Sequence, residues 1–253
     1  MIGTGLRVPA YAVTAALSAA IAFPSVAQAS DADEMAVAER LAALLQSSRE
    51  IVSEHQYLIN DPAIGDKHFE GDHVLQESSE IYERLVGEDL FAVAPETRSG
   101  RLLQAQMQAM KEVIHENQDT INTPGVGFKG FIPETFARLA NAKFTAAVGD
   151  EARLKVTAPM DLVRNRTARP DEWEQTVLDE KLSADDWPKD QPYSEVADVD
   201  GRPAFRMIFP EYYQASCLEC HGEPAGELDI TGYPKEGGKE GDLGSAISII
   251  LFR

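Results

Sequence analysis

Cysteine is nearly absent from this chain of 253 residues, which contains only two. Both lie in one pentapeptide, Cys217-Leu218-Glu219-Cys220-His221. A structural zinc site takes four protein ligands, and only His221 stands close to these thiols in the sequence. No third thiol is left for a second site, so the two cysteines must serve the same one.

Basic residues are also scarce. The chain has 23 Lys and Arg against 42 Asp and Glu, which gives a formal net charge of −19. This balance argues against nucleic acid and anionic membrane surfaces as partners, since both carry negative charge. The acidity indicates either plain solubility or steering toward a basic redox partner protein.

Motifs of several common enzymes are missing as well. The chain has no Gly-rich phosphate loop, no nucleophile elbow and no His-Glu-x-x-His zinc pattern. A peroxidase would need an acid–base pair beside its cofactor, and none is recognisable. The sequence therefore indicates no catalytic residues, and a binding or electron-transfer protein is favoured over an enzyme.

Only one long apolar run occurs before the C-terminal strand, at residues 10–23. Arg7 precedes it and Ala27-Gln28-Ala29 follows it, which is typical of a secretory signal peptide. We expect residues 1–29 to be removed and the remaining chain to be periplasmic. The run is short for a bilayer span, and an uncleaved membrane anchor is the alternative.

The spacing Cys-x-x-Cys-His is the one used to attach a c-type haem. Thiols three positions apart on a helical turn point the same way, so Cys217 and Cys220 can add to the two vinyl groups of one porphyrin. His221 follows directly and can bind the iron as its proximal ligand. We expect one covalent haem c; a redox-active dithiol and half of a zinc site are the alternatives.

Apolar spacing predicts helices over about 30–59, 72–86, 99–122 and 133–148, and the texture then changes to short strands. Strands are predicted at 153–158, 193–199, 204–209 and 244–253, with a short helix after Pro170. Helices on an antiparallel sheet make an α+β fold. The predicted organisation is a signal peptide (1–29), a helical region (30–130) and a haem-bearing region (131–253).

The helical region contains an internal duplication. Residues 49–69 align without gaps with residues 111–131, an offset of 62, and nine of the 21 pairs are identical. Each copy is a helix, an Asn-x-Pro stop and a Gly-x-Lys-x-Phe loop. We predict a duplicated helix–loop unit that packs against itself; shared helix-stop chemistry by coincidence is the alternative.

Several stretches, in this order and spacing, resemble the PAS-like c-type haem domain family, and together they cover about Met107 to the C-terminus. They are Lys129–Pro133 with Phe136, Val163–Asn165, Pro170–Glu174, Phe205-Arg206 with Phe209-Pro210, Cys217–Gly222 and Gly241–Ser248. The segment Arg166–Arg169 departs from the Asn-Pro-x-Asn turn of the family, so we expect this loop to differ in shape.

The resemblance implies a PAS-like antiparallel sheet that carries one covalent haem c. Family members occur as standalone periplasmic proteins and as sensor domains of membrane histidine kinases. This chain shows no transmitter, so we expect a standalone module. Its function is then expected to be that of a redox or gas sensor that acts with a separate signalling protein, or of a soluble electron-transfer cytochrome.

The second axial ligand of the iron decides between these functions, because a strong ligand favours electron transfer and an open position permits a diatomic gas to bind. Some relatives use a cysteine, but both cysteines here are committed to thioethers. The first candidate is His115, which lies beside the apolar residues Met107 and Met110 on a predicted helix. His55 is the second, and the two methionines are expected to be core residues.

The haem propionates would need local cations in so acidic a protein. Arg164, Arg206 and Lys129 are the candidates, because each falls in a stretch that resembles the family. An Arg side chain can pair with a carboxylate through two hydrogen bonds. Ordinary surface ion pairs are the alternative for all three.

Overall fold

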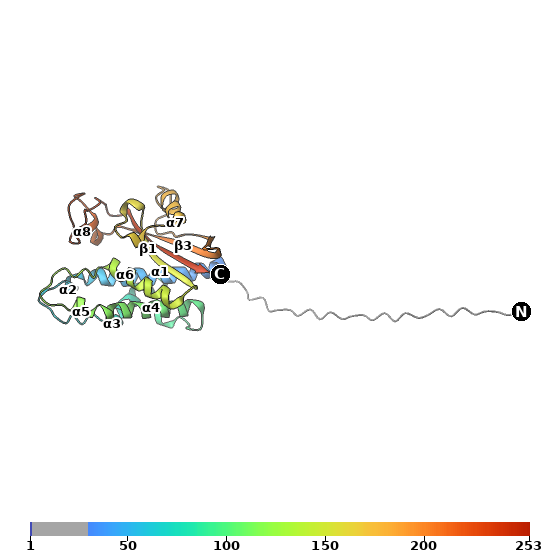
Figure 1. Cartoon of the computed structure of the whole chain (residues 1–253), viewed down its shortest axis with the longest axis horizontal. Coiled ribbons are helices and arrows are strands. Elements are labelled where there is room, and N and C mark those ends of the chain that lie inside the picture. The colour runs from blue at the N-terminus through green and yellow to red at the C-terminus, as the bar shows by residue number, and fades with distance from the viewer. Residues whose placement is uncertain (2–29) are drawn as a thin grey trace.

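The computed structural model describes residue 1 and residues 30–253, so the predicted signal peptide lies, apart from its first residue, outside the described residues. Within the described part of the chain, no helix is both long enough and apolar enough to cross a membrane. The chain from residue 30 onward forms a layer of helices against one face of a sheet (Figure 1).

Six helices precede the sheet. They are α1 (Asp31–Glu54), α2 (Gln56–Ile59), α3 (Gly71–Val86), α4 (Arg98–Glu116), α5 (Gln118–Ile121) and α6 (Pro133–Val148). The prediction of helices 72–86 and 133–148 is confirmed, and Ser30 is the N-cap of α1 with a full capping box.

The two longer predicted helices, 30–59 and 99–122, are each interrupted once. The interruptions fall at His55 and Asn117, which occupy corresponding positions in the duplication. Each side chain contacts the carbonyl oxygen four residues earlier, with His55 Nδ1 3.0 Å from Ile51 O and Asn117 Nδ2 2.7 Å from Val113 O. This local bond competes with continued helix geometry and separates a short helix from the long one.

The helix boundaries repeat with the same offset as the aligned sequences, and over a longer stretch than the alignment covers. An offset of 62 carries α2 onto α5, α3 onto α6, and the last residue of α1 onto the last residue of α4. The two copies also face each other, because Ser48 Oγ lies 3.3 Å from Met110 Sδ and these residues are themselves 62 positions apart.

Reciprocal hydrogen bonds join the two copies at their loops. Asn60 Oδ1 accepts from the backbone N–H of Lys129, and Asn122 Oδ1 accepts from that of Lys67, each at 3.0 Å. Gln56 donates to the carbonyl of Phe131 at 3.0 Å, and its counterpart Gln118 donates to that of Phe69 at 2.9 Å. Four of the identical pairs of the repeat, at Gln56, Asn60, Lys67 and Phe69 and their counterparts, therefore make these bonds between the copies.

The sheet contains β1 (Ala152–Thr157), β2 (Tyr193–Val199), β3 (Arg202–Tyr212) and β4 (Leu243–Phe252). The strand order is β1-β4-β3-β2, and all three pairings are antiparallel. Asp200 and Gly201 form the β2–β3 hairpin with φ angles of 55° and 79°, as a two-residue turn requires. The predicted α+β class is confirmed.

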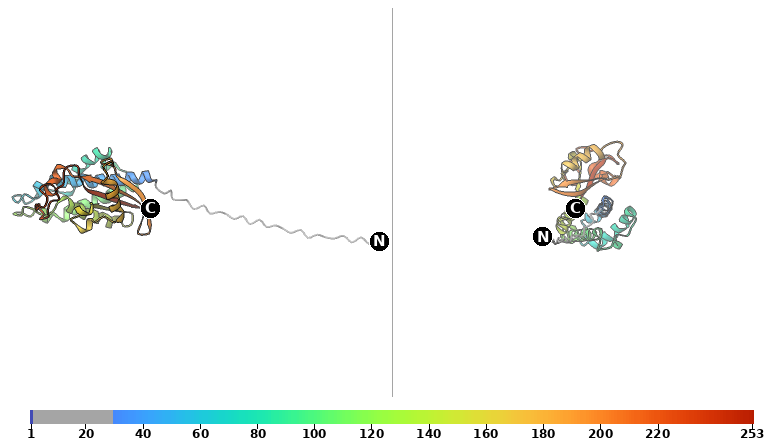
Figure 2. Two further views of the ribbon diagram at one scale, coloured as in Figure 1. Left: turned by 90° about the horizontal axis from the view of Figure 1, so that it is seen from above. Right: turned by 90° about the vertical axis from the view of Figure 1, so that its right-hand side faces the viewer.

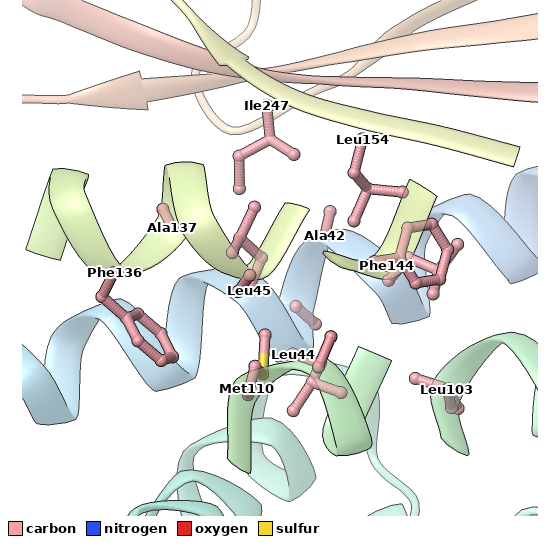
Figure 3. Packing of buried hydrophobic residues seen from close by; sticks show 14 of the residues in the cluster. Ala42, Leu44, Leu45, Leu103, Met110, Phe136, Ala137, Phe144, Leu154 and Ile247 are labelled. Atoms are coloured by element: carbon pink, nitrogen blue, oxygen red, sulfur yellow. The ribbon is translucent and has the colours of Figure 1, made fainter. Parts of the chain in front are cut away.

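One hydrophobic core joins the helices to the sheet (Figure 3). Leu154 and Ile247 point from the sheet toward Ala137 of α6 and Ala42 of α1, with Met110 of α4 on the far side of these helices. Seen from the end of the molecule, the sheet and the helices form separate layers (Figure 2). The predicted regions 30–130 and 131–253 therefore share a core, and α6 of the second region completes the helical layer.

The other face of the sheet is covered in part by α7 (Glu172–Val177) and the turn that follows it. Val177, Leu178 and Leu182 pack there against Ile208 of β3 and Ala246 of β4. This explains why the central strand β4 is apolar at nearly every position, since it is buried from both sides.

Because the hydrogen bonds between the two loops are reciprocal, removing either asparagine should lower the free energy of unfolding by a similar amount. Asn60→Ala and Asn122→Ala should each lower the free energy of unfolding by about 1–3 kcal/mol, because a backbone N–H of the opposite copy loses its acceptor. Thr120→Ala, at an exposed helical position, is the control and should change it by less than about 0.5 kcal/mol. Urea unfolding measures all three, and wild-type stability in both asparagine variants would contradict the reciprocal packing.

Candidate functional site

The Cys-x-x-Cys-His motif begins directly beyond the sheet. β3 ends at Tyr212, a short turn spans Ala215–Cys217, and α8 covers Leu218–His221. A Cβ at Gly222 would come within 2.6 Å of the Leu218 carbonyl oxygen, so glycine is needed where the chain leaves this helix. Both cysteines are free thiols and half-buried.

The imidazole of His221 is oriented by a carboxylate. Its Nδ1 lies 2.9 Å from Glu236 Oε2, and the ring is partly buried, with 30% of the side chain exposed. Since an ionised carboxylate only accepts, Nδ1 must carry the proton that is donated. The lone pair of a neutral imidazole is then on Nε2, and none of the hydrogen bonds among the described residues involves that atom. This is the arrangement of a metal-ligating histidine held by an outer carboxylate.

Tyr213 forms one wall beside this histidine. Its ring stacks on the His221 ring with centroids 5.1 Å apart and an angle of 23°. Cβ atoms at Gly238 and Gly244 would lie 2.5 Å and 2.3 Å from atoms of the Tyr213 ring, so both positions have room only for glycine. The tyrosine is thus clamped between two backbone segments, and it fixes the plane of the imidazole.

Arg164 ties the loop before α7 to the motif and to the segment after it. It donates to the carbonyl oxygen of Cys220 at 2.9 Å, to Asp229 at 2.6 Å, and to both carboxylate oxygens of Glu236 at 2.6 Å and 2.8 Å. The Tyr233 hydroxyl donates in turn to the Arg164 carbonyl at 3.0 Å. The same carboxylate therefore orients His221 and binds the arginine.

Electrostatics favour a neutral histidine and ionised carboxylates here. Burial, together with the positive charge of Arg164, lowers the pKa of His221. Burial opposes ionisation of Glu236, but hydrogen bonds from Arg164 and His221 bring its pKa below the usual value. For Asp229 burial likewise acts upward, yet hydrogen bonds from Thr231 and Arg164 hold its pKa well below the usual range. A neutral imidazole is the form that binds a metal.

The Cys220 thiol lacks the electrostatics of a redox-active cysteine. Burial and the negative charge of Asp229 raise the pKa of the Cys220 thiol, whereas catalytic cysteines have lowered values. This observation counts against the alternative of a dithiol oxidoreductase.

Two of the three predicted cations lie elsewhere. Arg206 of β3 donates to Asp171 at 2.6 Å and its guanidinium lies 4.1 Å from the centroid of the Trp173 ring, on the α7 side of the sheet. Lys129 donates from Nζ to the carbonyl oxygens of Ile59 and Val126 at the end of the helical repeat. Of the candidates, the structure brings only Arg164 to the motif.

The candidate sixth ligands are also distributed away from it. His115 is exposed on α4, and among the described residues no hydrogen bond, ion pair or ring contact joins it to the motif. His55 instead lies beside His73 and Glu77. Met110 is fully buried and Met107 packs at the edge of the same core, as predicted. The structure gives no support to His115 as an iron ligand.

Sequence reasoning missed Glu236 and Asp229, the two acidic residues that organise the motif. Both lie in the polar segment between α8 and β4, where an acidic residue is ordinarily solvated. Asp229 had one signal in the sequence: an aspartate shortly before Gly232 is typical of a turn. In the structure its side chain accepts from the backbone of Thr231 and Tyr233. Glu236 had none, because the contact with His221 is set by the path of the loop.

The chain was compared with models of known protein families. A family model described as Tll0287-like matches residues 91–251, which is well over half of the chain. The chain belongs to the Tll0287-like family. No curated protein and no solved structure matches it. The matched segment contains the second helical copy, the sheet and the motif, and leaves the first copy outside.

The lowered carboxylate pKa values predict a pH dependence. An acid whose pKa is lower in the folded state stabilises the fold above its unfolded pKa of about 4, and this contribution is lost as the pH falls further. Stability should therefore decline below about pH 4.5, and Asp229→Asn should remove up to one proton from that dependence. Urea unfolding of both proteins between pH 3 and pH 7 measures it, and identical slopes would contradict the role of Asp229.

Proposed function

We propose that this chain is a periplasmic mono-haem c-type protein that works as a redox or gas sensor module. Cys217 and Cys220 would hold the haem through two thioethers, and His221 would bind the iron from the proximal side. The four-stranded antiparallel sheet, with helices packed on one face, supports a PAS-like fold.

A single observation carries this proposal: the hydrogen bond between His221 Nδ1 and Glu236. It fixes the tautomer in which Nε2 carries the free lone pair and can bind a metal. The ring itself is also held in place by stacking on Tyr213. A solvated or purely structural histidine would not need both constraints. When bound, the haem would supply a one-electron couple and an iron coordination position.

Each neighbouring residue then has a definite task. Glu236 accepts from Nδ1 of His221 and so makes Nε2 a stronger lone-pair donor to a metal. Arg164 binds both oxygens of Glu236, and its positive charge weakens this effect. Of the three predicted cations, Arg164 is the one that contacts the motif, and it is the candidate partner for a propionate. Burial and the nearby Glu236 raise the pKa of Tyr213 to about 12, so its hydroxyl stays protonated.

The continuity of the core favours a sensor. Tyr213 directly follows β3, and β3 packs on the helical layer that carries the duplicated unit. A shift of His221 would therefore act on the sheet through Tyr213, and from there on α1 and α6. A minimal electron carrier needs no such helical layer.

A soluble electron-transfer cytochrome is the second candidate, because the net charge of −19 suits docking to a basic redox partner. Spectra of the purified haem-bearing protein separate gas sensing from redox sensing and electron transfer. A sensor of gases should bind CO or NO in the reduced state, with a shift of the Soret band. Low-spin spectra in both oxidation states, unchanged by either gas, would exclude gas sensing and favour redox sensing or electron transfer.

Glu236→Gln tests the carboxylate that orients His221. Glutamine can still accept from Nδ1 but carries no charge, so the imidazole becomes a weaker donor and the oxidised iron is less stabilised. The midpoint potential should rise by tens of millivolts, as measured by spectroelectrochemical titration.

Glu219→Gln is the matched control, because it removes one negative charge from an exposed position inside the motif. It should move the potential much less than Glu236→Gln does. Equal shifts in the two variants would mean that only net charge matters, and the proposed hydrogen-bonded role of Glu236 would be wrong.

A further inference from the structure

A second group of potential metal ligands lies in the first helical copy, away from the cysteine motif. His55 at the end of α1, with His73 and Glu77 on α3, places one donor atom from each side chain within 4.8 Å of the others. His73 Nε2 is 3.3 Å from Glu77 Oε1, and His55 Nε2 is 3.6 Å from Glu77 Oε2. Ligand atoms of a tetrahedral zinc ion lie about 3.3 Å apart, given bonds of about 2.0–2.1 Å.

The geometry of His55 suits a metal ligand. Its Nδ1 contacts the carbonyl oxygen of Ile51, so the proton is on Nδ1 and the lone pair is on Nε2, which faces Glu77. The ring is held between α1 and the ring of Phe69, whose centroid is 5.3 Å away, and only 16% of the side chain is exposed. The outer partner that a metal-bound histidine ordinarily has is therefore already present.

Glu77 supplies an independent observation. Its Oε2 is buried, and it has no hydrogen-bond partner among the described residues. An unpaired buried carboxylate oxygen costs free energy, and that cost would be removed by a cation between Glu77 and the two imidazoles. His73 and Glu77 are four residues apart on α3, so both project from the same side of that helix.

The duplication shows that the fold itself does not need these side chains. The second copy has Asn117, Thr135 and Leu139 at the corresponding positions. Asn117 makes the same bond to the carbonyl four residues earlier that His55 makes. The turn at position 55 therefore does not need an imidazole, because asparagine forms the same turn in the second copy. The histidine adds one atom that can bind a metal.

We propose that His55, His73 and Glu77 bind a divalent transition-metal ion, with Zn²⁺ as the best match to a donor set of two imidazoles and one carboxylate. Three protein ligands leave a fourth coordination position for water or a small anion. His55 and His73 line a cavity of about 500 Å³ together with His68 and Glu70, which leaves room for such a ligand. The proposal is independent of the haem, and the three residues lie outside the segment that matches the family.

The test uses the full mature chain, freed of metal with a chelator and titrated with Zn²⁺ against a chromophoric competitor. The wild type should bind one Zn²⁺ per chain. His55→Asn should weaken binding about 100-fold or more, because it removes a ligand yet keeps the bond to Ile51 that the second copy shows asparagine can make. His73→Asn, at a half-exposed position where folding is not at risk, should weaken it similarly.

His115→Asn is the matched control, since it removes one exposed histidine from α4 and should leave zinc affinity unchanged. X-ray absorption at the zinc edge should show nitrogen and oxygen neighbours with imidazole scattering. No stoichiometric binding, wild-type affinity in His55→Asn, or sulfur neighbours that place the ion on the cysteine thiols would each overturn the proposal. A changed haem spectrum in His55→Asn would also overturn it, by making His55 an iron ligand.

Discussion

The candidate site depends on the ion pairs of Arg164. One guanidinium binds the backbone of Cys220, both oxygens of Glu236 and one oxygen of Asp229, and it thereby joins three separate segments around His221. The segment between α8 and β4 has little regular structure, and few apolar side chains there are buried. Charge-assisted hydrogen bonds hold this segment in place, as hydrophobic packing does elsewhere in the chain.

The rest of the molecule gives this network a rigid base. The strand β3 leads into Tyr213, and Gly244, on one side of the tyrosine, belongs to β4. Gly238, on the other side, donates its backbone N–H to the carbonyl oxygen of His221 at 2.8 Å. The sheet is fixed in turn by α1 and α6, which belong to different copies of the duplicated unit. The duplication thus supplies a symmetric helical layer, and the two copies have diverged in the residues they present at their surfaces.

Much of the fold could be predicted from the sequence because its signals are local. Helix periodicity, the Ser30 cap, the Asp200-Gly201 turn and the apolar final strand each depend on a few neighbouring residues. The breaks at His55 and Asn117 were missed because a single side-chain bond to the preceding turn decides them.

The site was harder to predict, since it depends on contacts between distant segments. The motif itself could be read directly, and Arg164 was found because it lies in a stretch that resembles the family. Arg206 and Lys129 met the same criterion, yet the fold pairs one with Asp171 and uses the other at the helix ends. Glu236 could not be found, because nothing in its local sequence distinguishes it from a solvated acid.

We propose that Cys217 and Cys220 hold a porphyrin whose iron would be bound by His221. The most direct test is the intact mass of the mature chain, isolated from a host with cytochrome c maturation machinery, together with its pyridine haemochrome spectrum. We expect a mass increase equal to one haem and the absorption band of a double thioether, both lost when Cys217 and Cys220 are replaced by serine. An unmodified mass and no haemochrome band would contradict it.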